Sequence, residues 1–318
     1  MKPPLNPLQR EGETRIETII EKMKRIAIQG ELGSFHDIAA RQYFCGEQVQ
    51  LICCSTFEQV YEQIKRDPTV IGLTAIENTI AGSLLHNYEL LRDSGTAVVG
   101  EHKLHIEHSI CCLPEDSWET LTEVHSHPVA LMQCRAFLSN HPTLKAVEAE
   151  DTAGSAEYIR RHQCQGWAAI CHAEAAEMYG LKVLENKIED NKHNFTRFLV
   201  VCNPNKADFM RSLEQADKAS LVFSLPHEEG SLSKVLTILS FYSINLTKIQ
   251  SLPVIGHEWE YMFYVDVTYS NLTRYRQAID AIMPLTKELK ILGEYEASPS
   301  PSKGRGAVKG LNRKIVKS

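Results

Sequence analysis

Short apolar runs alternate with amphipathic stretches over residues 25–202, and this alternation dominates the first two thirds of the chain. Runs of β-branched and aliphatic residues predict strands, and apolar positions three and four apart predict helices. The predicted strands are, in order, 25–29, 50–54, 70–76, 105–112, 123–125, 146–149, 167–171 and 195–202. Because helices of 8 to 12 residues alternate with these strands, the pattern predicts an α/β fold of two lobes with a cleft between them.

The pattern changes after Cys202. Residues 203–218 carry a proline and several charges and are expected to form a linker. Strand, helix, strand, strand, helix and strand then follow at 220–225, 230–242, 245–253, 258–268, 272–286 and 289–294. This βαββαβ order predicts a ferredoxin-like domain. Such a domain leaves a helical face and a sheet edge free to pair with a copy, so a homodimer or homotetramer is expected.

The 318 residues therefore divide into several parts. The expected parts are a tail with a short helix at 1–24, a two-lobed domain at 25–202, a linker at 203–218, a second domain at 219–296 and a disordered tail at 297–318. Within the two-lobed domain, we expect the first lobe at about 25–98 and 182–202 and the second lobe at about 99–181.

The composition is that of a globular protein, with 43% hydrophobic and 23% charged residues. The net charge of −6 is unevenly distributed, because residues 297–318 contain six basic residues and no acidic one. The rest of the chain thus carries −12, which argues against nucleic acid as a partner of the folded part. With no long apolar run and no signal-peptide pattern, we expect a cytoplasmic protein that does not bind membranes.

The cysteines and histidines do not predict a metal site. The nine cysteines include no C-x-x-C pair, and the adjacent pairs 53–54 and 111–112 lie in apolar runs, which favours buried thiols over disulfides or metal ligands. His102, His105 and His108 are three residues apart on a predicted strand, so their side chains fall on different faces.

Polar residues cluster where predicted strands end. Glu77, Asn78 and Thr79 follow the buried strand 70–76, and the carboxyl end of a strand in an open α/β sheet is a usual place for a ligand. Glu77 could equally cap the next helix. The glycine turn at 30–33 leads into a helix N-terminus suited to an anion, or is a plain turn, and it lacks the G-x-G-x-x-G pattern of a dinucleotide site.

Two further pairs of residues are candidates for chemistry. Thr196 and Arg197 begin the strand 195–202, where a rigid sheet can hold polar groups, although an ordinary β-former and a surface charge would look the same. Ser126 and Gln133 are seven residues apart at the start of a helix, about two turns, so both could line one rim.

Six short blocks resemble, in the same order, segments of the prephenate dehydratase family. They are residues 29–35, 76–83, 126–134, 151–153, 179–181 and 188–198. The last block contains Asn194-Phe195-Thr196-Arg197-Phe198, which is similar to the N-x-T-R-F segment of the family. No single block is decisive, but their common order over about 175 residues makes the resemblance specific.

The resemblance implies a periplasmic-binding-protein-like catalytic domain with the substrate between the lobes. The implied reaction converts prephenate to phenylpyruvate, CO2 and water in L-phenylalanine biosynthesis, without a cofactor or metal. It implies that Thr196 donates a hydrogen bond to the leaving hydroxyl, with Glu77 and Arg197 as further catalytic residues. Arg197 could face away from Thr196, because strand neighbours alternate. The implied substrate-binding residues are Asn78, Thr79, Ser126, Gln133, Thr152 and Phe198.

The second domain resembles an ACT domain, the amino-acid-sensing module often found behind this catalytic domain. The family's G-A-L turn and E-S-R-P segment read Gly230-Ser231-Leu232 and Gln250-Ser251-Leu252-Pro253 here. The resemblance implies L-phenylalanine as a possible effector, and the residues implied to bind it are Gly230, Leu232, Asn245, Leu246 and Ser251. Because the acid and the arginine of the second segment are absent, a domain that only dimerises remains an alternative.

Two other functions remain open. Arogenate dehydratase would carry out the same elimination on a substrate with an amino group in place of the keto group, and one or two contacts could decide between the substrates. A non-enzymatic sensor of small anions would use the same two-lobed cleft. That alternative gives no reason for Glu77-Asn78 and Thr196-Arg197 to occur together.

Overall fold

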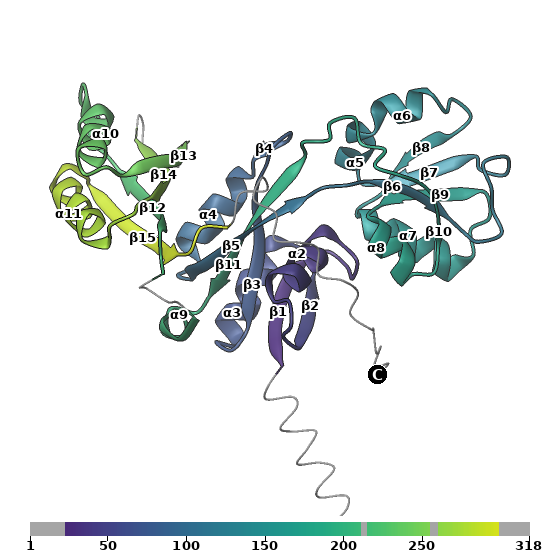
Figure 1. Cartoon of the computed structure of the whole chain (residues 1–318), viewed down its shortest axis with the longest axis horizontal. Helices are drawn as coiled ribbons and strands as arrows, with labels where there is room; N and C mark the ends of the chain where they lie inside the picture. The colour runs from purple at the N-terminus through teal and green to yellow at the C-terminus, as the bar shows by residue number, and fades with distance from the viewer. Residues whose placement is uncertain (1–22, 211–214, 255–259, 299–318) are drawn as a thin grey trace, which may run out of the picture.

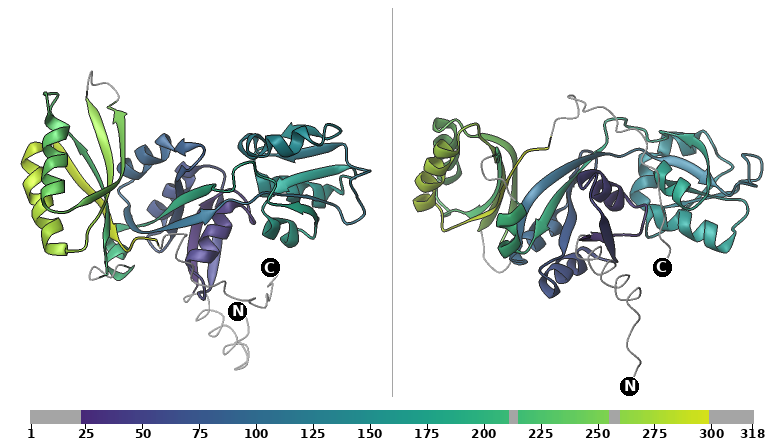
Figure 2. Two further views of the ribbon diagram at one scale, coloured as in Figure 1. Left: turned by 45° about the horizontal axis from the view of Figure 1, so that its top comes forward. Right: turned by 60° about the horizontal axis from the view of Figure 1, so that its bottom comes forward.

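The computed structural model describes residues 23–210, 215–254 and 260–298, which form three units in a row (Figure 1). Lobe 1 lies in the middle, lobe 2 lies at one end, and the C-terminal domain lies at the other end (Figures 1 and 2). The helix expected before residue 24 and nearly all of the expected tail at 297–318 fall outside the described residues.

Lobe 1 is built on a mixed sheet with the strand order β5-β11-β3-β1-β2. Strands β1, β2 and β3 are parallel, whereas β11 runs antiparallel to both β3 and β5. Every residue from Ile71 to Ile76 in β3 is buried, as expected of a strand covered on both faces. Its elements are β1 (Lys24–Gln29), α2 (Phe35–Tyr43), β2 (Val49–Cys54), α3 (Phe57–Arg66), β3 (Ile71–Asn78), β4 (Gly82–Ser83), α4 (Leu85–Asp93), β5 (Ala97–His105), β11 (Phe195–Cys202) and α9 (Pro204–Met210).

Lobe 2 has a separate five-stranded sheet with the order β10-β6-β9-β7-β8. Strand β7 is parallel to β8 and β9, and β6 is antiparallel to β9 and β10. Its elements are β6 (Ser109–Cys112), β7 (Glu123–Ser126), α5 (Pro128–Gln133), α6 (Arg135–Ser139), β8 (Lys145–Glu148), α7 (Thr152–His162), β9 (Trp167–Cys171), α8 (Ala173–Met178) and β10 (Lys182–Asn186). The two-lobed α/β architecture predicted from the sequence is confirmed.

Two segments connect the lobes, residues 106–108 and residues 187–194. The predicted lobe limits were wrong by several residues at both crossings, because β5 pairs with β11 in lobe 1 and β10 pairs with β6 in lobe 2. The second lobe was expected to begin near residue 99, whereas β5 continues in lobe 1 to His105. Glu101 is nevertheless buried, since it lies in a cluster of ion pairs.

The C-terminal domain has the predicted βαββαβ order and the ferredoxin-like strand order β13-β14-β12-β15. Its two long helices cover the sheet face that points away from lobe 1 (Figure 1). Its elements are β12 (Lys218–Ser224), α10 (Ser231–Phe241), β13 (Asn245–Pro253), β14 (Tyr261–Thr268), α11 (Leu272–Ile282), a 3-10 turn (Met283–Leu285) and β15 (Glu288–Tyr295).

The sheet of the C-terminal domain continues into that of lobe 1. Gly293 of β15 lies beside Val98 of β5 in a parallel pairing. A Cβ atom at Gly293 would lie only 2.0 Å from the carbonyl oxygen of Val98, so the close approach requires glycine. Part of the segment expected to be a linker forms the helix α9. No helix in the described ranges is long and apolar enough to cross a membrane.

Candidate functional site

A hollow of about 260 Å³ lies between the lobes. Both lobes supply its walls, which include the carboxyl end of β3, the start of β11 and the first residues of several helices. Among its lining residues are Ser34, Phe35, His36, Asn78, His108, His127, Gln133, Glu150, Asp151, Thr152, Thr196 and Phe198. The hollow is the place where polar residues that are distant in the sequence meet.

The backbone fixes the orientation of the Asn78 side chain. Its Oδ1 accepts hydrogen bonds from the backbone N–H groups of Ile80 and Ala81, both at 2.9 Å. Because Oδ1 is held in this way, the Nδ2 group must face the opposite direction, where it acts only as a donor. Nδ2 donates to Asn194 Oδ1 at 2.7 Å and to Thr196 Oγ1 at 3.0 Å.

This arrangement determines which way the Thr196 hydroxyl can donate. Thr196 lies directly opposite Asn78 in the register of β11 and β3, and its side chain lines the hollow. Since Oγ1 accepts a hydrogen bond from Asn78, its own hydrogen is not used in that contact. The hydroxyl is therefore free to donate to a molecule in the hollow.

Asn194 extends this series of directed hydrogen bonds from lobe 1 to lobe 2. Asn194 lies on the second connection between the lobes and is fully buried. Its Oδ1 accepts from Asn78, and its Nδ2 donates to Gln133 Oε1 at 3.0 Å. Gln133 ends α5 of lobe 2, so a chain of directed hydrogen bonds joins Thr196, Asn78, Asn194 and Gln133. We call these four residues the amide relay.

Glu77 and Arg197, both predicted to be catalytic, face away from the hollow. The register that pairs Thr196 with Asn78 also pairs Arg197 with Glu77. Successive side chains of a strand point to opposite faces, so the second pair lies on the side of the C-terminal domain. Arg197 Nη1 lies 3.0 Å from Glu77 Oε1 and 2.5 Å from Asp266 Oδ2, and Arg197 Nε lies 2.8 Å from Glu101 Oε2.

Three carboxylates and three cations form this cluster. Lys218 Nζ lies 2.7 Å from Glu101, and Lys248 Nζ lies 2.6 Å from Glu77. Lys218, Lys248 and Asp266 belong to the C-terminal domain. Burial acts to raise the pKa of Glu77, but the charges of Arg197 and Lys248 outweigh it and hold the pKa below its ordinary value. Arg197, which the resemblance implied to be catalytic, therefore joins lobe 1 to the C-terminal domain through ion pairs.

Two predicted substrate-binding residues serve other contacts. Ser126 is fully buried, and its hydroxyl donates to the carbonyl of Ile170 at 2.6 Å. Thr79 Oγ1 donates to the carbonyl of His193 and accepts from the N–H of Phe195, which joins two loops at the rim. Neither residue lines the hollow. Asn78, Gln133, Thr152, Thr196 and Phe198, by contrast, line it.

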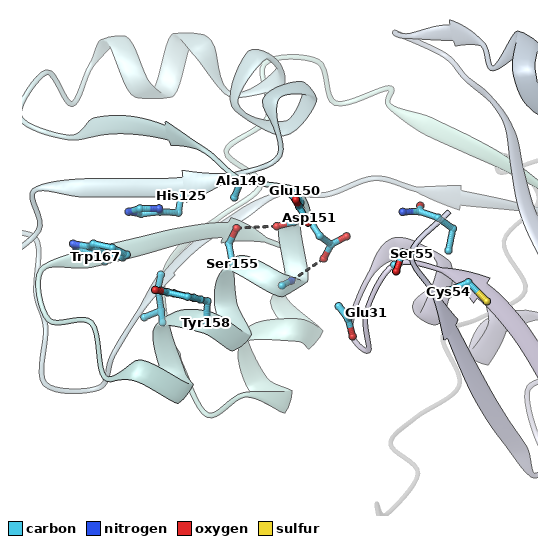
Figure 3. A pocket seen from close by; sticks show the side chains of 14 residues that line it. Glu31, Cys54, Ser55, His125, Ala149, Glu150, Asp151, Ser155, Tyr158 and Trp167 are labelled. Atoms are coloured by element: carbon cyan, nitrogen blue, oxygen red, sulfur yellow. Dashed lines mark hydrogen bonds between the residues drawn. The ribbon is translucent and has the colours of Figure 1, made fainter. Parts of the chain in front are cut away.

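A second hollow of about 510 Å³ adjoins the first and shares Gln29, Glu150 and Asp151 with it. Glu150 and Asp151 of lobe 2 lie opposite Glu31 and Ser55 of lobe 1 (Figure 3). Burial raises the pKa of Asp151. No lysine or arginine is among the described residues that line either hollow, so both hollows are acidic at the edge they share.

Helix N-termini rather than cations provide positive potential around the first hollow. The first residues of α2 and α7 line it, and these helices come from different lobes. The N-terminus of α4 also reaches it through Leu84, and no side chain caps that helix. The Asp151 carboxylate already caps α7 by accepting from the N–H of Gly154, and Ser34 caps α2 by accepting from the N–H of Asp37. The helix dipole and the remaining free N–H groups of α2 and α4 favour an anion at those two ends. The site is therefore suited to an anion held by neutral donors.

Three residues of the site were missed by reasoning from the sequence. Asn194 stands inside the N-x-T-R-F segment but was not singled out, although its polar side chain directly precedes a buried strand. His36 and His108 line the hollow, and burial lowers the pKa of His36 to about 3 and also lowers that of His108. Both histidines are therefore neutral. Single histidines in apolar surroundings gave no signal that could separate them from core residues.

The structure does not gather the predicted effector residues into one hollow. Gly230 caps α10 with a φ of 76°, and Leu232 lies in a shallow hollow on the outer face of α10. Asn245, Leu246 and Ser251 lie on β13, the edge strand of the sheet. Within the described ranges, no group of three or more histidine, cysteine or acidic residues has an arrangement that could hold a metal ion.

Comparison with known proteins adds an independent result. A family model described as prephenate dehydratase matches residues 26–206. Arogenate dehydratase/prephenate dehydratase 6, chloroplastic, of Arabidopsis thaliana is 35% identical over 295 residues, which cover 87% of this chain and 70% of that protein.

Solved structures include two similar proteins. The prephenate dehydratase from Staphylococcus aureus is 26% identical with a TM-score of 0.73, and the match covers 86% of this chain and all of that one. GqqA, described as a novel type of quorum-quenching acylase, is 30% identical with a TM-score of 0.76, and the match covers 86% of this chain and 98% of that one.

Replacing Arg197 tests the structural role of the ion-pair cluster. We expect Arg197→Met to lower the free energy of unfolding by about 3–5 kcal/mol, because it leaves buried carboxylates with too few cations. Arg66→Met is the matched control, since Arg66 forms an exposed pair with Glu62, and a loss below about 1 kcal/mol is expected there. Urea unfolding of both variants measures the difference. Equal stability of the two variants would contradict the role given to Arg197.

Proposed function

Because the chain belongs to the prephenate dehydratase family, we propose that it converts prephenate to phenylpyruvate, CO2 and water. The observation that carries this proposal is the Thr196 hydroxyl, whose hydrogen is left free to donate into a hollow between two lobes. The reaction removes a ring carboxylate and a ring hydroxyl, and the aromatic ring that forms drives it. This chemistry matches a site of positioned donors.

The amide relay supplies what the elimination requires. The bond between the ring and its carboxylate breaks, the electron pair enters the ring, and the bond to the hydroxyl breaks on the opposite side. The departing hydroxyl needs hydrogen-bond donation as negative charge develops on it, and Thr196 is oriented to give it. A threonine hydroxyl is too weak an acid to transfer its proton fully, so a proton from solvent completes the water molecule.

Neutral donors hold the two carboxylates of the substrate in this proposal. The N-terminal ends of α2 and α4 line the hollow, whereas that of α7 is already capped by the Asp151 carboxylate. The amide nitrogen of Gln133 has no hydrogen-bond partner among the described residues and lines the same space. A carboxylate that must leave as CO2 is better held by such donors than by an arginine, because a strong ion pair would stabilise the charged ground state.

Thr196→Val tests the assigned donor. We expect kcat to fall by about 10²–10³-fold with KM little changed, because a preorganised donor acts mainly in the transition state. The measurement is phenylpyruvate release from prephenate without added cofactor. Thr122→Val is the matched control, since Thr122 is exposed in lobe 2 outside both hollows and its hydroxyl donates to the carbonyl of Gly166. A kcat equal to that of the control would remove Thr196 from the mechanism.

Arogenate is the second candidate substrate, and the acidic edge of the hollows favours it. Arogenate carries an ammonium group where prephenate has a keto oxygen. Glu150 and Asp151 stand where the two hollows meet, with Glu31 facing them, and no lysine or arginine is among the described lining residues to balance them. An ammonium group near these carboxylates would be stabilised, whereas a keto group would gain nothing.

A charge-neutral variant separates the two substrates. We expect Glu150→Gln to lower kcat/KM for arogenate by about threefold to tenfold and to leave that for prephenate unchanged, because only arogenate brings a cation to this edge. Steady-state kinetics with both substrates measure the ratio. An equal change for both substrates would show that Glu150 does not sense the amino group.

Acylase chemistry fits this geometry less well. Hydrolysis of an amide through a threonine nucleophile needs a base that takes the hydroxyl proton. The described hydrogen bond of Thr196 is to the Asn78 amide, which donates to Oγ1 and lowers its nucleophilicity. The arrangement therefore favours donation by Thr196 over attack by it.

The C-terminal domain is the place where we propose regulation and assembly. It has the ferredoxin-like βαββαβ order, β13 is the edge strand of its sheet among the described residues, and α10 exposes Phe241. We propose that two copies associate here and that L-phenylalanine binds between Gly230 or Leu232 of one element and Asn245, Leu246 or Ser251 of another.

Isothermal titration with L-phenylalanine tests this regulatory proposal. We expect binding heat at millimolar ligand or below, together with inhibition of the dehydratase, since an effector must bind two states with different affinity. D-phenylalanine is the control ligand. If no heat develops at millimolar L-phenylalanine, the domain serves dimerisation alone.

A further inference from the structure

His108 is a buried histidine that the reaction as described does not use. It lies on the first connection between the lobes, lines the hollow and is only 1% exposed. Its Nε2 lies 2.9 Å from Oε1 of Gln133. Its Nδ1 has no hydrogen-bond partner among the described residues. The ring therefore has one polar contact, and that contact is with the end of the amide relay.

The relay fixes the direction of this contact. The backbone N–H groups of Ile80 and Ala81 determine the orientation of Asn78, and Asn78 in turn makes Asn194 accept through Oδ1 and donate through Nδ2. Gln133 Oε1 must then be an acceptor, because Asn194 Nδ2 donates to it. A second neighbour at 2.9 Å from the same oxygen must also be a donor, so His108 carries its proton on Nε2.

We propose that His108 is a positioning residue: as the neutral Nε2–H tautomer it donates to Gln133 Oε1 and thereby turns both amide hydrogens of Gln133 toward the substrate. With Oε1 held by two donors, the Gln133 amide cannot rotate to present its oxygen to an anion. In a hollow lined by no described lysine or arginine, a carboxamide with two free hydrogens is a strong candidate to bind a carboxylate.

The surroundings of His108 support a neutral, fixed ring. Phe35 packs edge-on against the ring with the centroids 5.5 Å apart, and the backbone N–H of His108 donates to Glu189 Oε2 at 2.8 Å. Burial lowers the pKa of the imidazole, so the ring carries a single proton at neutral pH. The proton is more stable on Nε2, which can donate to Gln133 Oε1, than on Nδ1, which has no acceptor among the described residues.

Kinetics of three variants test whether His108 acts through Gln133, an inference that rests on the proposed dehydratase function. We expect His108→Phe to lower kcat/KM by about 10- to 100-fold, because the Gln133 amide would lose its fixed hydrogen bond to a charged substrate carboxylate. His108→Gln should recover most of the loss, because its amide can still donate. The double variant His108→Phe with Gln133→Ala should be no worse than Gln133→Ala alone.

A matched control and a spectroscopic measurement complete the design. His102 Nε2 lies 3.1 Å from Gln42 Oε1 outside the hollow, so His102→Phe should leave kcat/KM unchanged. Long-range ¹H–¹⁵N spectra of labelled wild-type protein report the tautomer, with the His108 signal assigned by its loss in His108→Phe. We expect the neutral Nε2–H form, and an Nδ1–H form or an imidazolium would overturn the proposal.

The outcomes separate this inference from the proposed function. Additive losses in the double variant, or equal losses in His108→Phe and His108→Gln, would show that His108 does not act by orienting Gln133. If the wild-type protein releases no aromatic product from prephenate or arogenate, the proposed function fails, while the spectrum still decides the tautomer.

Discussion

The Asn78 side chain, held between two backbone N–H groups and two side-chain acceptors, is the constraint on which the site depends. An isolated carboxamide can rotate by half a turn and exchange its donor and acceptor ends. At Asn78 this rotation would place the NH₂ group against the N–H groups of Ile80 and Ala81 and cost several hydrogen bonds. The polarity of Thr196, Asn194 and Gln133 follows from this one orientation.

The same hydrogen bonds couple the site to the arrangement of the lobes. Asn194 lies on one interlobe connection, and the other connection hydrogen-bonds to it, because the N–H of Ile106 donates to the Asn194 carbonyl at 2.8 Å. The glycine turn of lobe 1 also lies close to lobe 2, since a Cβ atom at Gly33 would lie 3.0 Å from the Cβ of Ala175. Asn78 of lobe 1 and Gln133 of lobe 2 both hydrogen-bond to Asn194, so the donors of the two lobes are joined through this connection.

The sequence could predict which residues of β3 and β11 line the hollow. It could not predict the ion pairs on the opposite face of these two strands. Thr196 and Asn78 meet because β11 runs antiparallel to β3, which brings the start of one strand beside the end of the other. Gln133 ends a helix of the other lobe, so only the family resemblance indicated that it would join them. Arg197 and Glu77 follow the same motifs but point to the other face, where only the tertiary structure provides Asp266 and Glu101 as partners. Ser126 was expected in the site but hydrogen-bonds to Ile170, whereas His108 was not expected there but lies beside Gln133. Local spacing encodes neither contact.

A neutron crystal structure of the deuterium-exchanged protein would test the polarity of the relay most directly, because it locates hydrogens that kinetics can only imply. The account predicts a deuterium on Thr196 Oγ1 that points into the hollow, and both amide deuteriums of Gln133 facing the same space. A Thr196 deuterium directed at Asn78, with the Asn78 oxygen turned to receive it, would contradict the account.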